Sequence, residues 1–186
     1  APLGLLPLGR LFYLGSLDEL TANPIEFITR STGTWALVFL CLTLCISPLK
    51  QWLELPWLVL HRRTLGLLSF FYACLHFLIW FYLDHLLDIQ AMFKDVYKRP
   101  FITMGFISFL LLWPLALTSN QASIRWLRQR WAQLHRLIYL IAITVILHYW
   151  WHKSGKNDYA QVSVYAIVIA ILLGYRVIEC RLKRTS

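Results

Sequence analysis

Twenty consecutive residues of this chain, TLGLLSFFYACLHFLIWFYL at 64–83, carry no charge. At about 1.5 Å per residue, a helix of this length spans the roughly 30 Å hydrocarbon layer of a bilayer. Residues 100–124 form a second uncharged run, in which Pro114 is expected to kink the helix. Three shorter segments are similarly apolar, at 34–49, 137–151 and 159–175. The sequence therefore predicts five membrane-spanning helices.

The composition supports this interpretation. In this chain 59% of the residues are hydrophobic and only 15% are charged. In a soluble domain roughly a quarter of the residues are charged. The apolar side chains must therefore face lipid as well as each other. Residues 2–17 are apolar except for Arg10 and are expected to be the remaining part of a first helix. We predict an all-α integral membrane bundle of five to six transmembrane helices. It is expected to form one domain over residues 1–186, without an internal repeat or a soluble catalytic domain.

The net charge of +9 is divided unequally between the two ends of the predicted helices. One end, formed by 50–63, 118–136 and 176–186, holds eleven Lys/Arg against Glu54 and Glu179. The opposite end holds six Lys/Arg and seven Asp/Glu, with Arg10 left aside. Basic loops stay in the cytoplasm. The C-terminus is therefore predicted to be cytoplasmic.

Three of the six histidines, His76, His135 and His148, lie at or inside apolar helices. An ionisable ring at membrane depth needs a partner and is by default a functional hypothesis. The alternative is that each ring only bonds a Ser, a Thr or a carbonyl of a neighbouring helix. The other three, His61, His85 and His152, lie at the ends of spans, where interfacial roles are usual.

Depth indicates which histidines share a site. His76 lies about twelve residues from the cytoplasmic start of its helix, and His148 lies about twelve residues past Arg136. Both are therefore roughly 18 Å from the cytoplasmic face. Two opposed imidazoles are what a six-coordinate heme iron needs. We therefore predict a b-type heme with His76 and His148 as axial ligands.

His135 precedes His148 by thirteen residues, which is about 20 Å along a helix. It cannot ligate the same iron, so it is a candidate ligand of an inner site. Arg62 and Arg63 lie at its level and are suited to bind propionates or phosphates. On an ideal helix His135 and His148 are roughly 140° apart, so either the helix is distorted or the rings serve different faces. The competing ligand pair is His76 with His135.

Other chemistries lack their motifs. The chain has no Walker-type glycine loop, no GxGxxG, no nucleophile–base motif and no CxxC. Its four cysteines show no metal-ligand spacing. The sequence therefore points neither to a catalytic site nor to an NAD(P)H-binding module.

Three strings together resemble the MsrQ (YedZ) family, within the ferric-reductase-like transmembrane group. They are HRRTLGLLSFFYACLHF, KRPFITMGFISFLLLWPLALTSNQ and WAQLHRLIYLIAITVILHYWW, at 61–77, 98–121 and 131–151. His76, His135 and His148 match the characteristic histidines of that family. The chain departs from the pattern at Arg128, where a glycine is expected, and at its short first helix.

The resemblance implies a heme-binding subunit of the bacterial inner membrane, with heme b and FMN as cofactors. It implies electron transfer from the quinone pool or a flavin reductase to a periplasmic molybdopterin methionine-sulfoxide reductase. That partner repairs oxidised envelope proteins. The chain itself would be an electron-transfer subunit rather than the catalytic subunit.

Two other functions remain open. One is a stand-alone transmembrane ferric or quinone reductase with a separate cytosolic electron donor. The other is a heme-free scaffold or transporter subunit whose histidines only hold helices together. If the acceptor is periplasmic, Lys94, Lys98 and Lys153 in the outer loops are expected to dock it.

Overall fold

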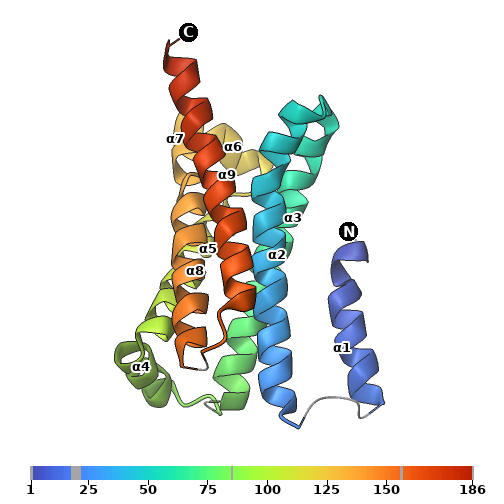
Figure 1. Ribbon diagram of the computed structural model, residues 1–186, viewed down its shortest axis with the longest axis vertical. Helices are drawn as coiled ribbons and strands as arrows, with labels where there is room; N and C mark the ends of the chain where they lie inside the picture. The colour runs from blue at the N-terminus through green and yellow to red at the C-terminus, as the bar shows by residue number, and fades with distance from the viewer. Residues whose placement is uncertain (1, 18–21, 85, 156, 186) are drawn as a thin grey trace.

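The computed structural model describes residues 2–17, 22–84, 86–155 and 157–185, and every regular element in these ranges is a helix. Five helical segments are long and apolar enough to cross a membrane, which confirms the predicted all-α membrane bundle. Their main helices run along the long axis of the molecule (Figure 1) and are α2 (Pro24–Trp52), α3 (Val59–Ile79), α5 (Pro100–Leu117), α8 (Leu137–Ser154) and α9 (Ala160–Thr185).

Shorter elements connect or extend these helices. The α-helical ones are α1 (Leu6–Ser16), α4 (Ile89–Lys98), α6 (Gln121–Leu127) and α7 (Gln129–Leu134). Two 3₁₀ turns cover Pro2–Leu5 and Pro56–Leu58, and a π-helical turn at Trp80–Asp84 continues α3. The outer and inner loops expected from the sequence are therefore partly helical.

The first apolar segment is not among the five segments that are long and apolar enough to cross a membrane. Its helix α1 has 11 residues and directly follows the 3₁₀ turn at Pro2–Leu5. It runs beside α2 (Figure 1). The hydroxyl of Tyr72 in α3 donates to the carbonyl of Gly4 at 2.8 Å, which attaches this segment to the bundle.

Helix α5 is shorter than the uncharged run at 100–124, and its end agrees with the basic segment that was expected to begin at residue 118. The helix ends at Leu117. The hydroxyls of Thr118 and Ser119 donate to carbonyls one turn back, at 2.6 Å each. Asn120 then caps α6 by accepting from the amide of Ser123. Small polar residues thus end the helix although no charge interrupts the run.

The predicted grouping of the basic segments is visible in Figure 1. The connection between α2 and α3 lies at the same end of the bundle as α6, α7 and the C-terminal part of α9. Helix α4 lies at the opposite end. The basic residues after 175 belong to α9, which continues to Thr185, so this segment is a helix extension rather than a loose tail.

The core is formed by four of the long helices. Its buried members come from α2, α5, α8 and α9 and are Leu37, Leu40, Cys41, Leu44, Leu112, Leu115, Ile138, Ile141, Ala142, Ile169 and Leu172. The outward face of α9 is also apolar, since Val164, Ile167 and Ile171 are 60–64% exposed. Exposed aliphatic side chains at helical spacing are what a lipid-facing surface requires.

Candidate functional site

His76 and His148 lie against each other in the interior of the bundle. His76 is near the end of α3 and His148 lies in the second half of α8. The centres of the two rings are 6.3 Å apart and the ring planes are inclined by 78°. The matched depth expected from residue counting therefore brings these two side chains together.

Each ring is held by a backbone carbonyl of the neighbouring helix. The Nδ1 of His76 lies 2.8 Å from the carbonyl oxygen of Thr29 in α2. The Nδ1 of His148 lies 2.6 Å from the carbonyl oxygen of Phe101 in α5. A carbonyl oxygen can only accept, so both Nδ1 atoms carry the proton in these bonds. In the neutral imidazole the Nε2 lone pair is then available to a metal.

Two glycines allow the rings to approach these helices. A Cβ atom at Gly33 would lie 3.0 Å from both Nδ1 and Cε1 of His76. A Cβ atom at Gly105 would lie 2.7 Å from Nδ1 and 2.8 Å from Cε1 of His148. Separations this short leave no room for a larger residue at Gly105 and very little at Gly33.

The spacing of the two rings suits one metal between them. With metal–imidazole bonds of about 2 Å on each side, the ring centres of two opposed ligands are roughly 6 Å apart. Within the described part of the chain, no three His, Cys, Asp or Glu side chains gather to hold a bare metal ion. Two imidazoles alone are sufficient when a porphyrin supplies the other ligands. The donor set therefore fits a six-coordinate heme better than a free ion.

Aromatic side chains of α3 and α5 form a cluster between these two helices, and the ring centre of Phe101 in α5 lies 6.1 Å from that of His148. Phe77 stacks on Phe109 with ring centres 4.7 Å apart, and Phe70 and Phe106 extend the cluster. Trp113 meets Phe70 edge-on at 5.2 Å. Apolar and aromatic side chains on the same two helices are compatible with a hydrophobic macrocycle.

His135 has a different environment. Its Nε2 lies 3.0 Å from the hydroxyl of Thr118, and its ring stacks on Trp131 with centres 4.0 Å apart. The indole of Trp131 also donates to the carbonyl of Thr118 at 2.9 Å. His135 is thus held by a threonine, whereas His76 faces His148.

The helix is tightened at His135. It lies between α7 and α8, where the amide of Ile138 bonds to the carbonyl of His135 only three residues back, at 3.4 Å. The angle of an ideal helix therefore does not apply between His135 and His148. Of the two explanations that the sequence leaves open, the structure shows a distorted helix.

The side chains of the neighbouring residues Arg62 and Arg63 lie in different environments. Arg62 is partly buried, and the charge of Arg176 in α9 acts on it. Arg63 is exposed and lines a shallow hollow with Leu60, Thr64, Leu67 and Leu68. Adjacent helical residues are about 100° apart, so only one of the two can face the bundle.

Arg176 in α9 is a second partly buried cation. Its Nη2 donates to the hydroxyl of Ser47, and its guanidinium lies 5.9 Å from the ring centre of Tyr139. Its Nε is buried and, in the part of the chain that the structure describes, has no hydrogen-bond partner. The charges of Arg62 and Arg176 and the unsatisfied Nε–H donor of Arg176 are suited to bind an anion.

The comparisons with known proteins decide the family. Residues 32–147 match the family described as ferric reductase like transmembrane component. The heme-binding subunit MsrQ of protein-methionine-sulfoxide reductase from Ralstonia nicotianae is 56% identical over 176 residues, which are 94% of this chain and 81% of the relative. The MsrQ of Herminiimonas arsenicoxydans is 52% identical, over 98% of this chain and 84% of the relative.

The chain belongs to the MsrQ family. The predicted resemblance is confirmed, and so is the ferric-reductase-like transmembrane fold. A more distant MsrQ, from Xanthomonas euvesicatoria, is 44% identical over 88% of this chain and 74% of the relative. No solved structure matches this MsrQ-family chain.

At the α4 end of this MsrQ-family bundle, the three lysines that were expected to dock a partner are not equivalent. Lys94 and Lys98 of α4 are exposed. Lys153 is only 4% exposed and forms an ion pair with Asp158, so it is not on the surface. Two of the histidines that were expected at the ends of spans are His85 and His152. The ring centre of His152 lies 5.5 Å from that of Phe101, and His85 lies outside the described residues.

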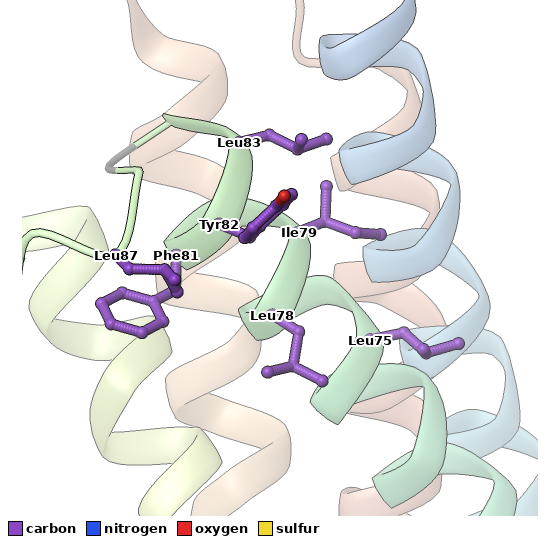
Figure 2. Close-up of a pocket in the computed structure, with 7 residues that line it drawn as sticks. All are labelled: Leu75, Leu78, Ile79, Phe81, Tyr82, Leu83 and Leu87. Carbon is purple, nitrogen blue, oxygen red and sulfur yellow. The ribbon is translucent and has the colours of Figure 1, made fainter.

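A hollow on the outer half of α3 lies away from these groups. Figure 2 shows its lining, which is Leu75, Leu78, Ile79, Phe81, Tyr82, Leu83 and Leu87. Its volume is about 350 Å³ and its lining is almost wholly aliphatic and aromatic. Neither His76 nor His148 lines it, so it is not part of the candidate site.

Proposed function

We propose that this chain is the b-type heme electron-transfer subunit of a methionine-sulfoxide reductase system, with His76 and His148 as the axial ligands. One observation carries the proposal. The two rings are 6.3 Å apart in the bundle interior, and both Nδ1 atoms bond backbone carbonyls. The MsrQ relatives are named heme-binding subunits, which supports the same cofactor.

The residues have separate tasks in this function. A heme held by the two rings would supply one-electron chemistry through its iron. The carbonyls of Thr29 and Phe101 fix the tautomer of each histidine. The aromatic cluster around Phe77 and Phe109 would supply apolar surface on the two helices α3 and α5.

The inner end is proposed to take part in electron entry. His135 is a candidate ligand of an inner site once its bond to Thr118 is exchanged. Arg62 and Arg63 were expected to bind an anion there, and Arg176 joins Arg62 in that task. A heme propionate and the phosphate of FMN are the two anions that fit this proposal. FMN itself is proposed from the family resemblance.

We propose an electron path that connects the two ends of the bundle. Electrons would enter from the quinone pool or a flavin reductase at the basic end and leave at the α4 end. The acceptor would be a periplasmic molybdopterin subunit that reduces methionine sulfoxide in oxidised envelope proteins. The charge asymmetry supports a multi-pass orientation in the bacterial inner membrane with a cytoplasmic C-terminus. A reporter fused behind α9 should be active only if it works in the cytoplasm.

An optical spectrum of the purified full chain tests the proposal. We expect a Soret band that shifts on reduction with dithionite, with α and β bands of low-spin heme b. Pyridine hemochrome analysis would give the heme stoichiometry. A purified, folded chain that carries no heme after expression with added heme precursor would refute the proposal and favour a heme-free scaffold.

A further inference from the structure

The two histidines are held by two helix pairs that are built alike. In the pair α2–α3, Thr29 and Gly33 contact His76, and in the pair α5–α8, Phe101 and Gly105 contact His148. Each histidine follows its carbonyl partner by 47 positions. Adding 72 to the numbers of the first set gives the numbers of the second.

A second pair of contacts continues this likeness. Three residues after Gly33, the carbonyl of Ala36 accepts from the hydroxyl of Ser69 in α3 at 2.9 Å. Three residues after Gly105, the hydroxyl of Ser108 donates to that of Thr144 in α8 at 2.8 Å. Each pair of helices is therefore bonded one turn beyond its glycine, which fixes the distance between the helices at that level.

The glycines matter because of where a helical side chain lies. A side chain in an α-helix leans over the preceding turn, towards the carbonyls of residues three and four positions earlier. Thr29 is four residues before Gly33, and Phe101 is four residues before Gly105. A side chain at either glycine would thus cover the carbonyl that the histidine uses. It would also collide with the ring, at 3.0 Å from His76 and 2.7 Å from His148.

We infer that Gly33 and Gly105 are positioning residues for the two axial ligands. Each glycine exposes one helix carbonyl, and that carbonyl fixes the tautomer and the rotation of the facing histidine. The inference rests on the proposed function, because it assigns the glycines a role towards the heme ligands. Neither glycine touches the cofactor position through a side chain of its own.

The inference has an electronic consequence. A bond from Nδ1–H to a carbonyl increases the basicity of the imidazole and strengthens its bond to the metal. Loss of that bond leaves a weaker donor, which stabilises ferric iron less. The midpoint potential of the heme should therefore rise when either carbonyl is covered.

The test compares four alanine variants of the full chain. Gly33→Ala and Gly105→Ala place a Cβ against a histidine. Gly66→Ala and Gly174→Ala are matched controls in α3 and α9, because a Cβ at Gly66 would meet only Thr43 at 3.8 Å and one at Gly174 would meet nothing within 4 Å. Alanine favours a helix over glycine at all four positions, so a general effect on helix stability appears equally in the controls.

Two readouts separate positioning from folding. The first is the rate of heme transfer to apomyoglobin, which should rise roughly 10–100-fold for Gly105→Ala and less for Gly33→Ala, whose ring needs to move only a few tenths of an ångström. The second is the midpoint potential, which should rise in both variants and stay unchanged in both controls. If Gly105→Ala does not accumulate in the membrane, Gly33→Ala decides on both readouts.

The contradicting outcomes are distinct. A folded wild-type chain without heme refutes the proposed function. A low-spin heme in the wild type, with heme transfer and potential in Gly33→Ala and Gly105→Ala equal to those of Gly66→Ala, leaves the proposed function intact and overturns the role of the glycines.

Discussion

The ring planes of His76 and His148 are inclined by 78°, so the two imidazoles are close to perpendicular. The carbonyls of Thr29 and Phe101 set this angle, because each fixes the rotation of one ring. If a heme is bound between them, perpendicular imidazoles would leave the two iron d orbitals that π-bond with the imidazole rings nearly equal in energy. Parallel imidazoles separate them.

The first prediction follows from this angle. The ferric protein should give a strongly anisotropic low-spin signal in electron paramagnetic resonance, with one dominant low-field feature. A rhombic three-line spectrum would mean that the rings are near parallel when heme is bound, and that the carbonyl bonds do not hold the angle.

The second prediction concerns the cations at the inner end. Arg62→Gln and Arg176→Gln should each weaken binding of an anionic cofactor and slow reduction of the heme from the cytoplasmic side, because both side chains are partly buried and the buried Nε of Arg176 has no partner among the described residues. Loss of one charge-assisted bond should cost about 1.5–3 kcal/mol of binding, or roughly 10–100-fold in affinity. Stopped-flow reduction and extractable flavin would measure these effects.

Arg63→Gln is the matched control for that experiment. Its side chain is exposed on the other side of α3, so its effect should be several-fold smaller. A larger effect at Arg63 than at Arg62 would reverse the assignment of the anion to the bundle interior.

The third prediction concerns docking at the outer end. Lys94→Glu and Lys98→Glu should slow electron transfer to the acceptor at low salt without loss of heme, because charge reversal mainly changes the association rate. The effect should fade as ionic strength increases. Equal transfer rates for wild type and both variants at low salt would argue against docking on α4.

The fourth prediction concerns the loop after α8. The buried Lys153 holds the pKa of the Asp158 carboxyl below its ordinary value, by a hydrogen bond and by its charge. A lowered pKa means that the ion pair stabilises the fold above the ordinary carboxyl pKa and that this contribution is lost as the pH falls through the lowered value. Asp158→Asn should therefore lower Tm at neutral pH, and the difference from wild type should shrink in acid.

Glu26→Gln serves as the comparison, since the Glu26–Arg30 pair is exposed and spans one helical turn. Such surface pairs contribute little. If Asp158→Asn lowers Tm at pH 7 by no more than Glu26→Gln does, the ion pair between Asp158 and Lys153 does not stabilise the fold.

The sequence predicts the spans because the signal for them is strong and local. An uncharged run such as 64–83 has few alternatives in a bilayer, and a constant rise per residue turns residue numbers into depth. The same rise predicted that His76 and His148 lie at one level, and the structure brings them together. Pairing of the basic segments at one end follows from the alternation of the spans.

Other features depend on how each helix is rotated, which residue counting does not give. Arg176 was read only as one charge of a basic tail, and its position beside Arg62 comes from the rotation of α9. Lys153 was expected in an exposed loop, yet α8 continues to Ser154 and buries it. Gly33 and Gly105 lie in apolar runs where glycine is common in membrane helices. Their equal separation from a histidine was the signal that could have found them.

The most direct test of the central claim is the heme content and spectrum of His76→Ala, His148→Ala and His135→Ala, each purified as the full chain. His76→Ala and His148→Ala should each lose most of the outer heme or make it high-spin. The double variant His76→Ala/His148→Ala should be no worse than either single variant, because both substitutions disable the same site. His135→Ala should keep the low-spin outer heme and slow only reduction from the cytoplasmic side. If His135→Ala abolishes the low-spin spectrum while His148→Ala retains it, the ligands are His76 and His135, and the pairing of His76 with His148 is contradicted.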